Sequence, residues 1–389
     1  MIPTNQHIAL LFGSGISCPA GLPSTANITE RVLSGNGISR HTDSTYFSGP
    51  PLYGIPDQYV PKVILLLARL KSEIDNYYDA YDRARATNYE DLYSLASQIH
   101  DTELGDFDNP APRSLIKQIL ADSENILHGK PHDTNGRWRL VDLCSEAMNY
   151  IRDVVWVELG KKPDNLSHLG FLLDAARDSA FKRKFIFTLN HDTLLETLFT
   201  RHSVSFIDGF ESPVSQLRKW NPQLYEFGQT TDLLLLKLHG SINWFFFEKN
   251  NSYTLAIPLT EFWDKHPHVL PADGRPEILV GTLNKILEYT NPIYIDLQCA
   301  FNRQLNHCQH LIISGYSFGD TGINTRIIQW MYSRPSNRLI IIHPDADSLL
   351  ERARTAIRNS WQGWQASQKL AVVPKAVENA NWTDIQQML

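Results

Sequence analysis

Residues 8–17 read IALLFGSGIS, in which an apolar run is followed by a segment with two glycines. The run Ile8–Phe12 has the length and apolar content of a buried strand. The turn that follows, Gly13-Ser14-Gly15-Ile16-Ser17, is suited to bring backbone N–H groups and a helix N-terminus onto phosphate, because glycine has no Cβ to block the approach. Cys18 occupies the third glycine position of the dinucleotide fingerprint GxGxxG, so a tight structural turn remains an alternative.

Four later apolar runs have the same character, and each ends at small or polar residues. They are Phe185–Leu189, Leu233–Leu238, Leu311–Ser314 and Leu339–Ile342. Helical spacing follows several of them, for example over Thr193–Thr200 and Thr325–Tyr332. This alternation of strands and helices predicts an α/β fold with a Rossmann-like, doubly wound parallel sheet.

The long stretch between the first two strands has a different pattern. We expect a helical insertion domain at 56–184, and a nucleotide-binding domain split into 1–55 and 185–389. Residues 35–56 are rich in Gly, Ser, Pro and Thr, which predicts a mobile loop, and residues 208–292 read as a partly irregular subregion of the core. The insertion is predicted from three apolar faces at helical spacing: Val63, Leu66, Leu67 and Leu70; Leu140, Leu143, Ala147, Tyr150, Ile151 and Val154; and Leu115, Ile119 and Ile126.

The composition narrows the class of protein. With 42% apolar residues and a net charge of −6, the chain can bury a core but has no overall basic field, so we expect no direct nucleic-acid binding. The run Ile8–Phe12 is too short to span a bilayer, which indicates a cytoplasmic protein with no membrane contact. The four cysteines include no CxxC pair, so we expect neither a disulfide framework nor a zinc site.

Polar residues follow the second and third strands directly. The second strand ends in Thr188-Leu189-Asn190-His191-Asp192, at the sheet edge where open α/β folds bind ligands. Capping of the next helix by Asn190 or Asp192 is the alternative. The third strand runs into Lys237-Leu238-His239-Gly240-Ser241, and an imidazole titrates near neutral pH, as an acid–base group should. A purely structural hydrogen-bonding role is the alternative for His239. We expect Asn190 and His239 to lie at solvent-facing strand ends and not in the core.

The strand Leu311–Ser314 also delivers small and polar residues. Gly315-Tyr316-Ser317-Phe318-Gly319-Asp320 follows it, with Asn324 four residues on, and such groups suit a ribose or phosphate contact. Capping of the next helix by Asp320 is the alternative. Four such signals at strand ends of one sheet favour a ligand site over capping alone.

These motifs resemble those of the sirtuin family in their residues and in their order along the chain. Gly13–Ser17 with Gly21 and Pro23 is similar to its GAGxSxxxGxP signature, Thr188–Asp192 to its TxNxD, His239-Gly240 to its HG and Leu311–Ser317 to its late GxS strand. The likeness covers residues 1–34, 183–245 and 308–375. It implies NAD as the ligand, surrounded by Gly13, Ser14, Gly15, Ser17, Gly21, Pro23, Asn190, Asp192, His239, Gly315, Ser317, Asp320 and Asn324.

Three departures separate the chain from sirtuin deacylases. No CxxC…CxxC zinc ribbon follows His239-Gly240, the segment after Leu22-Pro23 is Ser24-Thr25-Ala26 instead of Asp-Phe-Arg, and the long insertion is foreign to a minimal deacylase. The chain instead resembles the zinc-less sirtuin-like effectors of bacterial antiphage defence, which hydrolyse NAD and pair with a separate sensor or motor protein.

This resemblance implies an NAD glycohydrolase that yields nicotinamide and ADP-ribose and so depletes NAD. Its catalytic residues would be Asn190, which orients ribose or water, His239, which contacts the ribose hydroxyls and accepts a proton, and Asp192, which holds the nicotinamide side or the shape of the site. The glycine turn and Ser317 would hold the phosphates, and Asn324 or Asp320 the adenosine ribose. NAD is then the substrate of the reaction. Because the charge of the transition state develops on the ribose, neither zinc nor another metal is required. The alternatives are an NAD-dependent protein deacylase or ADP-ribosyltransferase, and a noncatalytic NAD or nucleotide sensor.

The resemblance also implies control from outside the chain, because an unregulated NAD hydrolase would drain the cofactor of its own cell. We expect a homo-oligomer with the helical insertion as its assembly surface; packing of the apolar face of the insertion onto its own sheet is the alternative. The expected partner is a HerA-like hexameric ATPase, with a short Argonaute as the alternative.

Overall fold

The computed structural model of the chain describes residues 6–51, 54, 57–81, 85–105, 109–121, 124–131, 136–226, 231–249, 251–266, 269–282 and 291–389. Its internal contacts divide the chain into two compact units. The sheet unit takes residues 1–22, 162–278 and 289–389, and the helical unit takes residues 23–161 and 279–288. In these described ranges, no helix combines the length and the apolar character that crossing a membrane requires.

The sheet unit is built on one parallel sheet of six strands, in the order β11-β10-β9-β1-β4-β6. From β1 the chain adds β4 and β6 on one side, then returns to add β9, β10 and β11 on the other. This is the order of a doubly wound nucleotide-binding sheet, with its reversal between β1 and β9, and it confirms the predicted fold class. The strands are β1 (Gln6–Phe12), β4 (Phe181–Thr188), β6 (Leu233–Lys237), β9 (His310–Ser314), β10 (Arg338–Ile342) and β11 (Leu370–Val373).

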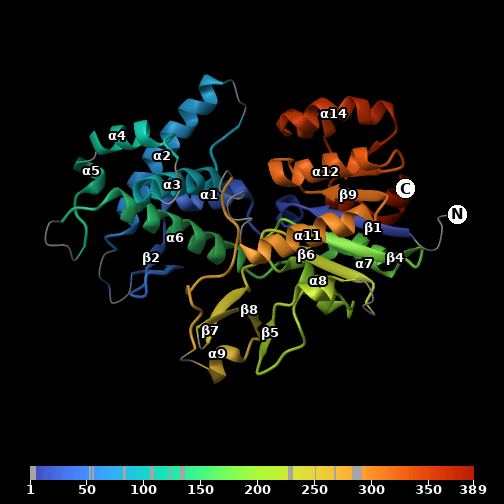
Figure 1. Cartoon of the computed structure of the whole chain (residues 1–389), viewed down its shortest axis with the longest axis horizontal. Helices are drawn as coiled ribbons and strands as arrows, with labels where there is room; N and C mark the ends of the chain where they lie inside the picture. The colour runs from blue at the N-terminus through green and yellow to red at the C-terminus, as the bar shows by residue number, and fades with distance from the viewer. Residues whose placement is uncertain are drawn as a thin grey trace. The chain divides into compact units, whose positions relative to one another are not determined.

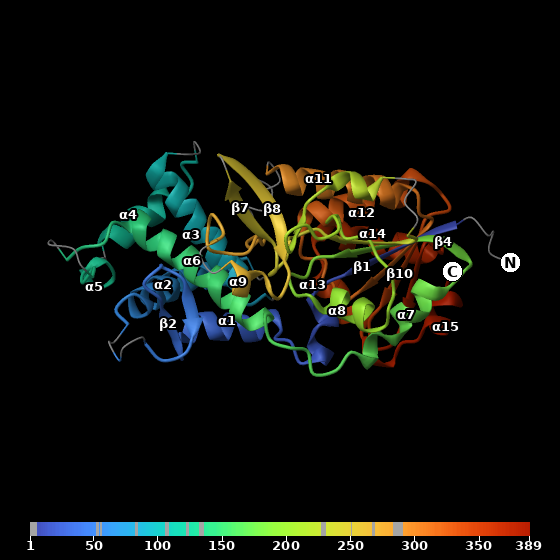
Figure 2. The same ribbon diagram turned by 90° about the horizontal axis from the view of Figure 1, so that it is seen from below.

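Helices cover both faces of this sheet, as Figures 1 and 2 show. Ile8, Leu10 and Phe12 on β1 alternate toward one face, where they join a core with residues of α7 (Gly170–Arg177), α8 (Leu194–Arg201) and α15 (Trp382–Gln386). The opposite face is covered by α11 (Pro292–Asn306), α12 (Thr321–Ser333) and α14 (Thr355–Ala366), and α13 (Ala346–Arg352) precedes α14. On that face the rings of Phe187 and Phe301 lie 4.6 Å apart.

The predicted irregular subregion, residues 208–292, contains order that the sequence did not indicate. Three short strands form an antiparallel sheet in the order β5-β8-β7: β5 (Leu217–Lys219), β7 (Phe245–Lys249) and β8 (Ser252–Pro258). The turn of helix α9 (Phe262–Lys265) follows. Nearby, the backbone of Ile207 donates to Leu233 O and accepts from Leu235 N, along the outer side of β6.

The helical unit contains α1 (Thr25–Ser34), α2 (Val60–Ala80), α3 (Tyr89–Leu104), α4 (Arg113–Ala121), α5 (Glu124–Leu127) and α6 (Leu140–Leu159). The predicted apolar faces on α2 and α6 are buried, while the third predicted face is shared between α4 and α5. The predicted loop 35–56 holds a hairpin, β2 (Ile38–Arg40) and β3 (Tyr46–Ser48).

The unit boundaries differ from those predicted. The helical unit begins at Pro23 and its main segment ends at Lys161, whereas we expected 56–184; Pro56 lies outside the described residues. Residues 162–184 belong to the sheet unit because α7 packs on the sheet and β4 begins at Phe181. The basic residues Lys182, Arg183 and Lys184 hid the start of this strand in the sequence.

The turns after β1 and β9 pack directly on each other where the sheet order reverses. Gly13 N donates to Ser314 O at 3.1 Å, and Gly15 N donates to Gly315 O at 3.0 Å. A Cβ at Gly13 would lie 2.6 Å from Gly315 O, and a Cβ at Gly15 would lie 2.7 Å from Gly315 Cα. These glycines are therefore required by contact of the chain with itself, in addition to any ligand.

We predict that Gly315→Ala lowers the free energy of unfolding by roughly 2–5 kcal/mol, because Gly315 has a φ of +67° and an added Cβ would lie 2.5 Å from Ile16 N. Urea unfolding followed by circular dichroism measures this change. Gly363→Ala is the matched control: it lies in α14 with no atom within 4 Å of an added Cβ, so stability should be equal or higher. Equal losses in both variants would contradict the prediction.

Candidate active site at the carboxyl edge of the sheet

The predicted site residues of the sheet unit lie on segments that follow β1, β4, β6 and β9 at one edge of the sheet. The turn after β1 forms two 3-10 turns, Ser14–Ile16 and Cys18–Ala20. Ser14 and Gly15 are exposed there. The next α-helix starts only at Thr25, so the predicted helix N-terminus does not follow the glycine turn directly.

The side chain of Asn190 is bonded to the glycine turn. Its Nδ2 donates to Gly13 O at 3.1 Å and to Ser17 Oγ at 3.0 Å, and its backbone N donates to Thr188 Oγ1 at 3.1 Å. Because a carbonyl only accepts, Gly13 O requires the amide nitrogen on its side and so determines the orientation of the amide. Asn190 Oδ1 accepts no hydrogen bond from any residue that the structure describes.

Asp192 completes this hydrogen-bonded group. Ser17 Oγ donates to Asp192 Oδ2 at 2.7 Å, and Leu194 N donates to Asp192 Oδ1 at 3.0 Å. One carboxylate oxygen therefore caps the first turn of α8, as the alternative from the sequence proposed, while the other orients Ser17. Hydrogen bonds link the side chains of Asn190, Ser17 and Asp192, and all three residues are almost fully buried. We call these three hydrogen-bonded residues the Ser17 network.

His239 and Asp320 form a second buried group at the same edge. His239 Nε2 lies 3.3 Å from Asp320 Oδ2, and their side chains are 4% and 10% exposed. The other carboxylate oxygen of Asp320 accepts from Ile323 N at 3.0 Å and caps α12. This contact is an ion pair when the imidazole is protonated. We expected Asp320 at the adenosine ribose, and the structure brings it to His239.

The segment after β9 uses most of its polar groups internally. Asn324 is 2% exposed: its Nδ2 donates to Phe318 O at 2.8 Å, and its Oδ1 accepts from Tyr316 Oη at 2.8 Å. These bonds stabilise a turn in which Phe318 has a φ of +56°. Ser317 is exposed. The side chain of Ser317 is therefore accessible to a ligand, whereas the side chain of Asn324 is used to stabilise the turn.

Gly21 and Pro23 are the remaining predicted site residues. Gly21 has a φ of +82°, and an added Cβ would lie 2.3 Å from Asp164 Oδ2, so its glycine is explained by local packing. Pro23 belongs to the helical unit.

One expectation about the site was wrong. We expected Asn190 and His239 at solvent-facing strand ends, but they are only 8% and 3% exposed. The reason is that the segment after β6 closes over the turn after β4: Ser241 Oγ and Ile242 N both donate to His191 O, at 3.2 and 3.0 Å. The rings of His191 and His239 lie 6.3 Å apart.

Sequence reasoning also passed over Lys237, Glu196 and Ser241. Lys237 is 1% exposed, and its Nζ donates to Asp192 O and to Glu196 Oε1. The sequence did contain a signal for Lys237, because this lysine stands between four leucines and Leu238 in a run that is otherwise apolar.

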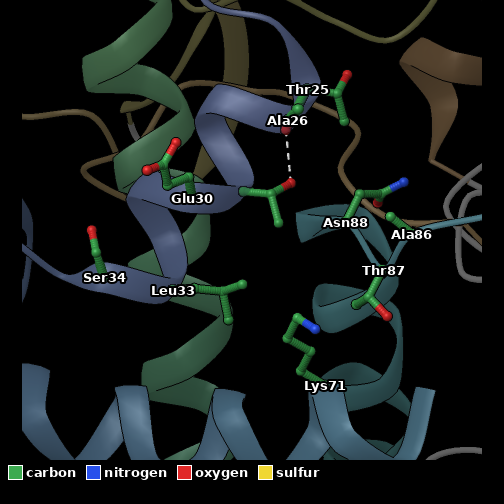
Figure 3. A pocket seen from close by; sticks show the side chains of 10 residues that line it. Thr25, Ala26, Glu30, Leu33, Ser34, Lys71, Ala86, Thr87 and Asn88 are labelled. Carbon is green, nitrogen blue, oxygen red and sulfur yellow. Dashed lines mark hydrogen bonds between the residues drawn. The ribbon is translucent and has the colours of Figure 1, made fainter. Parts of the chain in front are cut away.

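A groove in the helical unit is lined by residues of α1, α2 and the segment before α3 (Figure 3). Several of its polar groups already have partners: Thr29 Oγ1 donates to Thr25 O, Thr87 Oγ1 donates to Asp75, and Asn88 Oδ1 caps α3. Lys71 pairs with Asp75. No predicted site residue lines this groove.

The cysteines differ in environment. Cys18 and Cys299 are exposed and Cys144 and Cys308 are buried. Although Cys18 is exposed, partial desolvation raises the pKa of its thiol, and the nearby Asp192 carboxylate adds to this effect. Among the residues that the structure describes, no three or more His, Cys, Asp or Glu side chains are grouped so that they could hold a metal ion.

Comparison with known proteins finds no matching protein family and no matching curated protein. Among solved structures, a Sir2 homologue mutant in complex with 2′-O-acetyl-ADP-ribose is similar at 13% identity, over 98% of this chain and 91% of that one, with a TM-score of 0.37. A Sir2 homologue in complex with NAD is similar at 12% identity, over 98% and 89%, also with a TM-score of 0.37. The fold assignment rests on the strand order above and not on these similarities.

We predict that Asn190→Ala lowers the free energy of unfolding by about 1–3 kcal/mol, because it leaves Gly13 O and Ser17 Oγ without their buried donor. Chemical denaturation measures the change. Asn306→Ala, at an exposed position at the end of α11, is the matched control and should have little effect. A melt of Asn190→Ala identical to wild type would show that the Ser17 network does not stabilise the fold.

Proposed function

We propose that the chain cleaves NAD at its nicotinamide–ribose bond and releases nicotinamide and ADP-ribose. The strand order supports a dinucleotide ligand, since doubly wound sheets bind such ligands outside the carboxyl edge, where the strand order reverses. In this chain the reversal lies between β1 and β9, beside Gly13, Gly15 and Gly315. The motif resemblance to sirtuins supports NAD in particular.

The reaction requires little help at the leaving group. The bond between C1′ and the pyridinium nitrogen breaks, and its electron pair neutralises the ring, so nicotinamide leaves uncharged. Positive charge develops on the ribose while water adds to C1′ and gives up a proton. Preorganised dipoles near the sugar and a base near the water are therefore the groups that an enzyme must supply.

The two buried groups at the sheet edge can supply these functions. Asn190 Oδ1, whose amide nitrogen is bonded to the glycine turn, would accept a hydrogen bond from a ribose hydroxyl or from the attacking water. His239 would accept the proton, and Asp320 would stabilise the resulting imidazolium. Asp192 acts through Ser17 and orients Asn190.

The buried His239–Asp320 pair is the observation that carries this proposal. An acid–base pair beside the Ser17 network suits catalysis, whereas a sensor that only binds a nucleotide has no need of one. Transfer of ADP-ribose or of an acyl group to another acceptor is the second candidate, because the same groups would serve an acceptor in place of water.

We predict that the purified chain, alone or with the product of the neighbouring gene, converts NAD to nicotinamide and ADP-ribose without any acylated or acceptor protein. We expect His239→Gln to lower the rate by roughly 10²–10⁴-fold. Chromatography of both products measures it. His202→Gln, at the exposed end of α8, is the matched control and should keep the wild-type rate.

The outcomes separate the candidates. If NAD is consumed only when an acylated or acceptor protein is added, the chain is a transferase or deacylase. If NAD binds without turnover, with or without a second protein, the chain is a sensor. If His239→Gln keeps the wild-type rate, the role assigned to His239 is wrong.

We also predict that NAD protects Cys18 from alkylation and leaves Cys299 unprotected. Both thiols are exposed, but only Cys18 follows the glycine turn, where its Sγ lies 3.7 Å from Ser14 O. The raised pKa of Cys18 means that less thiolate is present at neutral pH, so labelling with iodoacetamide should speed up as the pH rises. Peptide mass spectrometry distinguishes the sites, and equal protection of both would contradict binding at the turn.

We propose in addition that the chain serves antiphage defence by depleting NAD, as a homo-oligomer controlled by a HerA-like hexameric ATPase or, as the alternative, a short Argonaute. The sirtuin-like motifs without a zinc ribbon support this. Light scattering, followed by co-purification with the product of the neighbouring gene, tests it: a monomer that is constitutively active and binds no such partner would contradict it.

A further inference from the structure

The strand β6 ends in a lysine whose charged group is buried. Lys237 is 1% exposed, and its Nζ donates to the backbone carbonyl of Asp192 and, at 2.9 Å, to Glu196 Oε1 on α8. The Glu196 side chain is 16% exposed, and burial raises its pKa although Lys237 opposes the shift. Burying this pair therefore carries a desolvation cost.

Stability alone does not account for such a pair. Replacing a buried ion pair with apolar residues of similar volume is often neutral or stabilising, because the attraction rarely exceeds the cost of removing both charges from water. An apolar residue at position 237 would also continue the four leucines that precede it. What an apolar residue cannot do is donate to the Asp192 carbonyl.

That carbonyl lies in the turn that carries the candidate site. The preceding carbonyl, His191 O, accepts from Ser241 Oγ and Ile242 N, so the segment around the end of β6 bonds two successive carbonyls of this turn. The side chains of Asn190 and Asp192 project from the same turn into the Ser17 network. The backbone of this turn is thus bonded by the segment around the end of β6, and its side chains are bonded within the Ser17 network.

We propose that Lys237, paired with Glu196, is a positioning residue that holds the turn 190–192 so that Asn190 Oδ1 stays aligned with the reacting centre. This inference rests on the proposed function for its catalytic consequence and on the contacts of Lys237 for its structural one. Lys237 itself does not touch the substrate in this scheme. It acts through the Asp192 carbonyl.

The test replaces the ion pair with an apolar pair, Lys237→Met with Glu196→Leu, in the full chain. Removing two buried charges favours the fold, while the lost donor to the Asp192 carbonyl opposes it, so we expect only a small change in the unfolding midpoint. We expect kcat for NAD cleavage to fall roughly ten- to a hundredfold with a smaller change in KM. The matched control is Lys375→Met with Asp384→Leu, which removes an ion pair elsewhere in the sheet unit and should leave kcat unchanged.

Amide hydrogen exchange gives a readout that does not depend on NAD. In the apolar double variant the amides of residues 189–193 should exchange about tenfold faster, while those of β1 and β9 exchange at wild-type rates. Wild-type kcat together with unchanged exchange would overturn the proposal. If wild-type protein cleaves no NAD but exchange still rises locally, the proposed function fails and the positioning role stands.

Discussion

The contact between the turn after β1 and the turn after β9 is the constraint on which the sheet unit depends. These two strands are neighbours at the reversal of the strand order, and their turns approach closely enough that Gly13, Gly15 and Gly315 leave no room for a Cβ. With the backbones so close, the Asn190 side chain can reach the Gly13 carbonyl and Ser17 from the end of the next strand. The site is thus assembled by the same packing that closes the sheet.

The strands in the middle of the sheet could be predicted because each buries an unbroken apolar run, as parallel strands covered on both faces must. Two features escaped for physical reasons. Leu370–Val373 forms β11, but four residues are too few for periodicity to distinguish a strand from a helix. The start of β4 carries Lys182, Arg183 and Lys184, whose charges interrupt the apolar pattern although the strand is already buried at Phe181, Arg183 and Lys184.

In the candidate site, the sequence identified which strand ends carry polar groups but not which groups pair. His239 follows β6 and Asp320 follows β9, and two strands lie between them in the sheet, so their contact depends on loop paths that no local pattern encodes. The burial of His239 was missed for the same reason. Capping explained one oxygen of Asp192 and one of Asp320. The second oxygen of Asp192 accepts from Ser17, and that of Asp320 lies 3.3 Å from His239 Nε2.

The backbone bonds of Ile207 have a consequence for self-association. An edge strand with four consecutive leucines would normally be a template on which a strand of another molecule could add, the route by which sheets aggregate or swap segments. At β6, Ile207 occupies Leu233 O and Leu235 N on the outer side of the strand. Copies of this chain could therefore continue the sheet across β6 only after Ile207 had been displaced.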